Sequence, residues 1–180
     1  RGVSLHWVNT AELSDVRLRQ FHEDGKVRIT AEIVADVVNP AAELQAVCTL
    51  TAPDGGETRV TVPVENGKAD AEFTVEHPEL WWPNGYGAQP LYTVTVTLQS
   101  ADKAVDSYTC RLGLRTITVC TDKDEFPGSQ FSVVVNGQKI FSMGANYIPE
   151  DNIRGRVTAE RSRRLIADCA AANFNMIRIW

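Results

Sequence analysis

Carboxylates are the residues of this sequence with which acid and base chemistry would begin. Catalysis by a pair of carboxyl groups, one as acid and one as base or nucleophile, requires the two to lie close together in space. The candidates are Glu150 with Asp151, the acidic run at 122–125, and Asp168. Adjacent loop residues point in different directions, the run is typical of a solvated linker, and Asp168 falls inside a predicted helix. The sequence therefore predicts no catalytic pair within the chain.

Thiol and imidazole chemistry is not indicated either. The four cysteines are widely spaced and form no Cys-x-x-Cys pair: Cys48, Cys110, Cys120 and Cys169. No histidine lies at metal-ligand spacing from them, so we predict no metal site. Cys48 and Cys110 both fall in predicted strands. A disulfide between them is one alternative, and buried free thiols are the favoured one.

The closing stretch of the chain predicts a strand, a helix and a second strand. Residues 139–146 are short and apolar enough for the first strand, and 175–180 alternate as the second. Between them, Thr158 is a plausible N-cap and Asn173 a terminator. Two strands joined by such a helix are parallel, with a right-handed crossover. The pattern therefore predicts a β-α-β unit.

The strands of this unit carry polar residues near their ends. Side chains alternate with period two, so Asn146 shares a face of the first strand with Ser142 and Gly144. In the second strand, Arg178 and Trp180 share a face. A buried arginine is costly unless it is paired, so Arg178 is expected to meet a carboxylate. The alternative is a solvated edge arginine beside a core tryptophan.

Upstream of this unit, strand-like segments recur with turn residues between them. They cover 16–21, 27–38, 44–51, 57–62, 69–75, 91–98 and 107–119. About seven short strands in about a hundred residues is typical of an antiparallel β-sandwich. Leu5 and Trp7 alternate near the start of the chain and suggest a leftover edge strand. Asn136-Gly137 predicts a hairpin after a charged, turn-rich boundary at 120–127.

An aromatic loop interrupts the strands at 77–90. It carries Trp81, Trp82 and Tyr86 among prolines and glycines. Such rings can stack on the apolar face of a sugar. Packing against a neighbouring part of the protein is the alternative, and the prolines favour it because they imply a fixed loop.

Composition excludes some partners. The net charge of −5 argues against a nucleic-acid surface, and no apolar run approaches the roughly 20 residues that span a bilayer. Five arginines cluster at 154–164, but acidic residues are interleaved, so a solvated helix face is favoured over an anion site. The sequence does not give the compartment, and a cytoplasmic one is our working expectation.

Four motifs then carry a resemblance to a known family. GANYIPED at 144–151 and NMIRIW at 175–180 resemble the opening of the catalytic (β/α)8 barrel of glycoside hydrolase family 2, in its β-mannosidase branch. LWWPNGYGAQPLYTVTV at 80–96 is similar to the middle immunoglobulin-like domain of those enzymes. GLRTITV at 113–119 resembles the strand that leaves that domain. The resemblance covers nearly the whole chain, in the family's order.

The resemblance implies a mainly β fold. An immunoglobulin-like β-sandwich would be followed by a β-hairpin and the first β-α-β unit of a (β/α)8 barrel. The expected domains are 1–12, a remnant of a preceding sugar-binding domain, 13–120, the sandwich, and 121–180, the linker hairpin and the truncated start of the barrel. The absence of an initial Met and the stop at Trp180 suggest an excised piece of a longer enzyme.

The implied activity is that of a retaining β-mannosidase, which cleaves terminal β-linked mannose without a metal or organic cofactor. Active sites of such barrels lie at the C-terminal ends of the strands. Asn146, Arg178 and Trp180 are then candidates for the substrate pocket, with Arg178 orienting a carboxylate and Trp180 stacking on the sugar. Asp151 would shape the sugar site or cap the loop. Both catalytic glutamates of the family come from later strands, so these residues alone are expected to be inactive.

Two other functions stay open on the sequence. One is a non-catalytic β-sandwich module that binds carbohydrate or protein, and the other is the same family with β-galactosidase or β-glucuronidase specificity. The apolar surface of the β-α-β unit is also expected to drive self-association.

Overall fold

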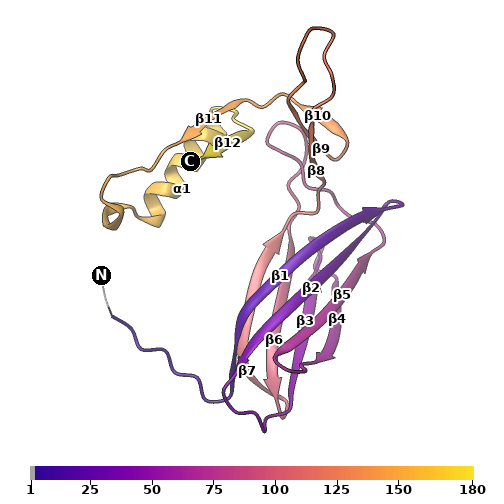
Figure 1. The fold of residues 1–180 in the computed structure, drawn as a ribbon, viewed down its shortest axis with the longest axis vertical. Coiled ribbons are helices and arrows are strands. Elements are labelled where there is room, and N and C mark those ends of the chain that lie inside the picture. The colour runs from indigo at the N-terminus through magenta and orange to yellow at the C-terminus, as the bar shows by residue number, and fades with distance from the viewer. Residues whose placement is uncertain (1–2) are drawn as a thin grey trace. The chain divides into compact units, whose positions relative to one another are not determined.

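The structure is a computed structural model that describes residues 3–180. These residues are mainly β, with one α-helix among them, and the chain forms two compact units. One unit consists of Ser4–Glu79 with Pro90–Leu114, and the other contains Leu80–Gln89 with Arg115–Trp180. Figure 1 shows the strands of both units. The second unit carries the residues that the sequence singles out for chemistry.

The first unit is a sandwich of two antiparallel sheets. One sheet has the order β1-β2-β5 and the other β4-β3-β6-β7. The strands are β1 (Ala11–Glu23), β2 (Lys26–Val37), β3 (Leu44–Thr51), β4 (Glu57–Pro63), β5 (Lys68–Val75), β6 (Tyr92–Ser100) and β7 (Lys103–Leu112). A sandwich was predicted, and six of its strands lie where the sequence placed them, within a few residues at each end.

The core of the sandwich follows the alternation in the sequence. In β2, the inward residues Val27, Ile29, Ala31 and Ile33 are at most 1% exposed. Phe73 of β5 lies opposite Ile29 and is 2% exposed. Strand β6 contributes its alternate residues in the same way, from Tyr92 to Leu98. The burial of one face of each sheet against the other stabilises the unit through the apolar area removed from water.

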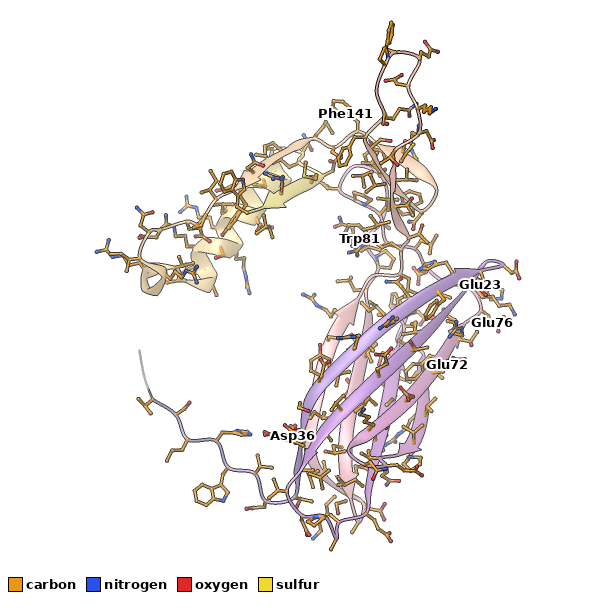
Figure 2. The ribbon with its side chains drawn as sticks, in the orientation of Figure 1. Glu23, Asp36, Glu72, Glu76, Trp81 and Phe141 are labelled. Atoms are coloured by element: carbon orange, nitrogen blue, oxygen red, sulfur yellow. The ribbon has the colours of Figure 1, made fainter. Side chains whose placement is uncertain are left out.

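The outer face of the sandwich carries ion pairs between strands. Lys26 Nζ lies 2.5 Å from Glu76 Oε2, and Arg28 Nη1 lies 3.2 Å from Glu72 Oε2. Figure 2 labels the two glutamates. Exposed pairs of this kind contribute about 1 kcal/mol or less. These carboxylates are therefore ordinary surface groups of a solvated sheet.

The predicted strand at 107–119 is wrong as a single element. Strand β7 ends at Leu112, and a separate strand, β8 (Ile117–Cys120), pairs in another sheet. Between them, Leu114 is fully buried, and the Gly113 carbonyl accepts a hydrogen bond from Gln20 Nε2. These contacts hold the segment between β7 and β8 outside both sheets. The apolar pattern of the sequence therefore continues through residues that do not belong to a strand.

The N-terminal edge strand is not found among the described residues. Residues 3–8 have no regular structure, and Leu5 and Trp7 are 91% and 81% exposed. Alternation alone does not form a strand, because the backbone groups also need a paired neighbour.

The second unit holds two small sheets. Strands β8, β9 (Ser132–Val135) and β10 (Gln138–Ile140) form an antiparallel sheet, and the predicted Asn136-Gly137 turn closes its hairpin. Strand β11 (Gly144–Tyr147) pairs in parallel with β12 (Met176–Ile179), with helix α1 (Ala159–Ala171) between them in the chain. A short 3-10 turn, η1, covers Arg154–Arg156. The predicted β-α-β unit is confirmed.

The predicted strand at 139–146 is divided by a side chain. Asn175 Oδ1 accepts a hydrogen bond from Met143 N at 2.9 Å, and Asn175 Nδ2 donates to the Phe141 carbonyl at 3.0 Å. The Asn175 amide therefore takes the Phe141 carbonyl and the Met143 N–H, while the Met143 carbonyl accepts from Asn175 N and Met176 N. As a result β10 and β11 belong to different sheets.

All four cysteines are free thiols. Cys48 on β3 and Cys110 on β7 flank β6, where they lie opposite Val96 and Val94. A whole strand thus separates the two sulfur atoms, and the prediction of free thiols is confirmed, although only Cys48 is buried and Cys110 is half-buried.

Burial makes Cys48 the least reactive of these thiols. It is fully buried, and desolvation raises the pKa of its thiol from 9.0 to about 11. We expect iodoacetamide at pH 8 to label Cys48 only after unfolding, as measured by mass spectrometry of tryptic peptides. The Cys48 thiol also holds its proton more tightly in the folded state than in the unfolded chain. The stability of the fold should therefore decrease as pH rises from 9.0 to about 11. Labelling of native Cys48 at the rate of half-buried Cys169 would contradict the expectation.

Candidate functional site

The ends of β11 and β12 bring two of the predicted pocket residues together. Asn146 and Arg178 are direct partners in the parallel register, and Arg178 Nη1 donates to Asn146 Oδ1 at 3.2 Å. Both side chains are exposed. The expected partner of Arg178 was a carboxylate, whereas the acceptor here is an amide oxygen. The pair therefore presents one guanidinium charge at an open strand end.

Close approach of the two strands depends on Gly144. It lies opposite Met176, and a Cβ atom built on Gly144 would come within 2.7 Å of the Met176 carbonyl carbon. That distance is far inside van der Waals contact. Glycine is therefore required at the base of the strand pair that carries Asn146 and Arg178.

Trp180 and Asp151 have different surroundings. Trp180 is 73% exposed, and its backbone N–H donates to the Tyr147 carbonyl at 3.1 Å. Asp151 Oδ1 accepts from Ile153 N at 2.8 Å, and Asp151 Oδ2 lies 3.8 Å from Arg161 Nη1. The structure thus gives Asp151 the loop-capping contacts that were one of its two predicted roles.

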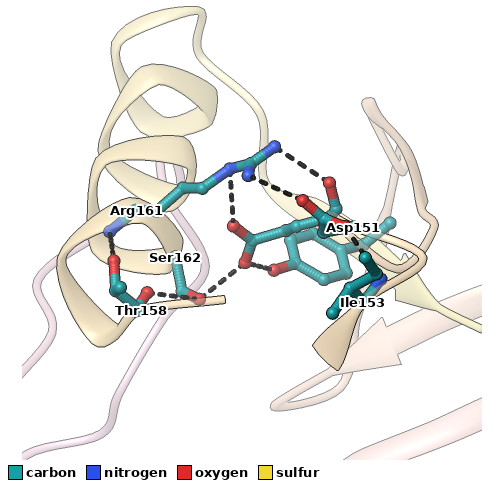
Figure 3. Close-up of polar contacts among 7 residues, drawn as sticks. Asp151, Ile153, Thr158, Arg161 and Ser162 are labelled. Atoms are coloured by element: carbon teal, nitrogen blue, oxygen red, sulfur yellow. Dashed lines mark hydrogen bonds and ion pairs between the residues drawn. The ribbon is translucent and has the colours of Figure 1, made fainter. Parts of the chain in front are cut away.

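A buried carboxylate, Glu150, lies between the loop after β11 and the first turn of α1. Its side chain is 1% exposed, and its Oε1 accepts from Ser162 Oγ at 2.6 Å and from the Tyr147 hydroxyl. Arg161 Nε lies 3.3 Å from Glu150 Oε2, and Arg161 Nη2 donates to the Glu150 carbonyl at 2.9 Å. The dashed lines in Figure 3 mark these contacts.

The electrostatics of this cluster favour an ionised Glu150. Hydrogen bonds from Ser162 and then Tyr147, with the charge of Arg161, hold the pKa of the Glu150 carboxyl below its ordinary value, against desolvation. The hydrogen bond that Tyr147 donates to Glu150 raises the pKa of the Tyr147 hydroxyl. Since the folded pKa of Glu150 is lowered, its contribution to stability is present above the unfolded pKa and is lost as pH falls through the folded one.

The adjacent carboxylates of Glu150 and Asp151 do not diverge as the sequence suggested. Both reach the guanidinium of Arg161, at 3.3 and 3.8 Å. The turn that Asp151 caps brings its side chain back towards the helix. Because the two carboxylates are occupied by an arginine and hydroxyl groups, they are not arranged as nucleophile and acid.

The aromatic loop at Leu80–Gln89 makes contacts inside the second unit. The Trp81 ring lies under the guanidinium of Arg115, 4.4 Å from its centroid, and the Trp81 carbonyl accepts from Asn136 Nδ2 at 3.0 Å. The Tyr86 hydroxyl accepts from Phe141 N at 3.1 Å. Figure 2 labels Trp81 and Phe141. These contacts support the favoured packing role of the loop.

Two further contacts complete this picture. The Trp82 ring lies so close to Gly87 that a Cβ there would come within 2.9 Å of it. Asn84 Nδ2 donates to the carbonyls of Ala170 and Phe174, at 3.3 and 3.1 Å, and so caps the C-terminal end of α1. The sequence Asn84-Gly85 predicts a turn, but it does not predict that Asn84 binds the end of α1, which is more than 80 residues away.

The described part of the chain shows neither a metal-binding cluster nor a membrane-spanning helix. In residues 3–180, no group of three or more His, Cys, Asp or Glu side chains could hold a metal ion. No helix in the same residues has the length and apolar character to cross a membrane.

Comparison with known proteins identifies the family. The family described as glycosyl hydrolases family 2 matches residues 11–115, which is more than half of the chain. The chain belongs to glycosyl hydrolase family 2. Among family 2 relatives, beta-mannosidase B of Aspergillus oryzae is 32% identical over 96% of this chain, and that of Aspergillus clavatus is 35% identical over 99%. The chain spans 21% of the length of each relative.

Solved structures agree with this family 2 assignment. The beta-D-mannosidase of Dictyoglomus thermophilum matches with a TM-score of 0.84 and 28% identity, covering 96% of this chain and 22% of that one. The beta-glucuronidase of Bifidobacterium dentium matches with a TM-score of 0.73 and 18% identity, covering 93% and 27%. The second likeness is one of fold alone. The predicted resemblance to β-mannosidases of the family is confirmed.

Proposed function

We propose that this chain forms the immunoglobulin-like sandwich and the first β-α-β unit of the catalytic (β/α)8 barrel of a retaining β-mannosidase. The observation that carries the proposal is similarity to proteins named beta-mannosidase along almost the entire chain. The parallel pair β11 and β12, with α1 between them, is the arrangement that begins such a barrel. The proposed domains are 1–12, 13–120 and 121–180.

Asn146, Arg178 and Trp180 are proposed to line the substrate pocket. They lie at the C-terminal ends of parallel strands, which is the face where barrels of this kind place their active sites. The fixed charge of Arg178 can hold a neighbouring carboxylate ionised or bind a sugar hydroxyl. Trp180 offers an exposed ring on which a pyranose can stack. Asp151 would act indirectly, by shaping the loop that follows β11.

The carboxyl pair for double displacement is proposed to come from strands outside residues 1–180. The adjacent carboxylates of Glu150 and Asp151 both pair with Arg161. A mechanism with two glutamates needs no metal or organic cofactor. Residues 1–180 alone are then a non-catalytic part of the enzyme, and the exposed apolar side chains of the β-α-β unit would favour self-association.

An activity assay separates this proposal from its competitors. Purified residues 1–180 should leave p-nitrophenyl β-D-mannopyranoside intact, and the complete product of the gene should hydrolyse it. In that product, Arg178→Ala should lower kcat/KM by about a hundredfold, since a charged hydrogen bond contributes about 3 kcal/mol. Arg163→Ala, at an exposed position of α1, is the matched control and should change kcat/KM by less than about twofold.

Three results would count against the proposal. Turnover by residues 1–180 that Arg178→Ala abolishes would contradict the missing carboxyl pair. Preference of the complete product for a β-galactoside or β-glucuronide would change the substrate. Saturable binding of mannose to residues 1–180 that depends on Trp81, Trp82 or Tyr86 would favour a binding module.

A further inference from the structure

We propose that Glu150 is a positioning residue, whose buried carboxylate ties the loop after β11 to the first turn of α1 and so holds Asn146 in contact with Arg178. The inference rests on the proposed function, because it assigns Asn146 and Arg178 to the substrate pocket. It gives Glu150 a role other than the half of a catalytic pair for which the sequence made it a candidate.

Burial of Glu150 needs compensation, and the structure supplies it from two segments. A carboxylate removed from water is costly unless hydrogen bonds and an opposite charge replace its hydration. Tyr147 donates from the end of β11, whereas Ser162 and Arg161 contribute from α1. Arg161 also binds the Glu150 backbone carbonyl. The carboxylate therefore joins the end of β11 to the first turn of α1, beside the Asp151–Arg161 ion pair that links the same two segments.

The connection to Asn146 runs through Tyr147. Adjacent strand residues point to opposite faces, so anchoring the Tyr147 side chain orients the Asn146 side chain the other way. The Tyr147 carbonyl accepts from Trp180 N at 3.1 Å, which aligns the end of β12 with the end of β11. Asn146 and Arg178 face each other one step before this bond. Fixing Tyr147 thus fixes the strand ends that carry the pair.

The same geometry argues against a direct chemical role for Glu150. Its side chain is 1% exposed, and both oxygens face donors within the protein. A general acid must carry a proton and reach the substrate, and neither condition is met by an enclosed, ionised carboxylate. An anchor, in contrast, benefits from a permanent charge, from the two hydrogen bonds on Oε1 and from the ion pair of Oε2 with Arg161.

Hydrogen exchange in the 180-residue chain tests the anchor without reference to activity. In Glu150→Ala, the amides of Ile153 and Trp180 should exchange at least about tenfold faster, because a lost bond of about 1.4 kcal/mol corresponds to that factor. Glu150→Gln keeps the shape and an acceptor for a hydroxyl but loses the charge, so it should restore part of the protection. Glu160→Gln, at an exposed glutamate of the same helix, is the control and should leave exchange unchanged.

Kinetics of the complete gene product then test the consequence for the pocket. Glu150→Gln and Tyr147→Phe should raise KM for p-nitrophenyl β-D-mannopyranoside about tenfold and change kcat less than about threefold, as expected for lost positioning of binding groups. Unchanged exchange in Glu150→Ala would overturn the inference, and so would loss of kcat at constant KM. If the unsubstituted product does not cleave the mannoside, the proposed function fails, while the exchange result still decides the anchoring role.

Discussion

Gly144→Ala is expected to separate β11 from β12. The new methyl group would meet the Met176 backbone, and the built Cβ lies within 2.7 Å of the Met176 carbonyl carbon. Backbone cannot move aside as a flexible side chain can, so we expect a loss of about 3 kcal/mol in local stability. Alanine also restricts the unfolded chain, which stabilises by about 0.4 to 1 kcal/mol. The cost of the clash exceeds this stabilisation, so the net effect should be that β11 and β12 separate.

Hydrogen exchange with mass spectrometry would measure this opening. Peptides that cover β11 and β12 should lose protection in Gly144→Ala, whereas peptides from the sandwich should not change. Gly155→Ala is the matched control, because a Cβ at that position would meet nothing within 4 Å. Equal protection of β11 in Gly144→Ala and Gly155→Ala would show that the strands tolerate the added methyl group.

Phe73→Ala should be the most damaging single substitution in the sandwich. Phe73 is 2% exposed and is the largest of the fully buried side chains of this chain. Truncating a core phenylalanine removes buried area and leaves a cavity, at a cost of about 3 to 5 kcal/mol. That loss is a large fraction of the stability of an ordinary domain. The midpoint of urea unfolding, followed by circular dichroism in the β-sheet region, should fall accordingly.

Phe126→Ala provides the comparison for this experiment. Phe126 is 77% exposed, so its removal should change the free energy of unfolding by less than about 0.5 kcal/mol. A similar shift of the urea midpoint in both variants would mean that Phe73 does not pack in the core.

Much of the fold follows from local patterns. The alternation in β2 and β6 identifies the buried face, and Asp24-Gly25 and Asn136-Gly137 place hairpins because both turns need positive φ. Thr158 caps α1 as its residue type predicts, by accepting a hydrogen bond from Arg161 N. Each of these features depends on residues close together in the sequence.

The errors have a common cause. Strands 107–119 and 139–146 were predicted as continuous because their apolar pattern continues, but distant partners interrupt them. The Asn175 side chain bonds the Phe141 carbonyl and the Met143 N–H, and Gln20 bonds the Gly113 carbonyl. Pairings over 32 and 93 residues cannot be deduced from a periodic pattern.

The candidate site shows the same division between local and distant information. Period two correctly placed Asn146 and Arg178 at the strand ends, and their contact follows from the parallel register. The sequence missed Glu150, which was considered only as one half of a catalytic pair. A glutamate three residues after a strand-end tyrosine, with a serine in the next helical turn, was the available signal.

The aromatic loop and the β9–β10 hairpin share a chemical weakness. Asn84 and Asn136 each precede a glycine, and each uses its side-chain NH₂ as a donor, to Phe174 and to Trp81. Asparagine followed by glycine is the sequence most prone to deamidation, which replaces the donor with a carboxylate. A negative oxygen would then face a carbonyl oxygen at either junction. Deamidation during storage would therefore loosen the helix end and the hairpin.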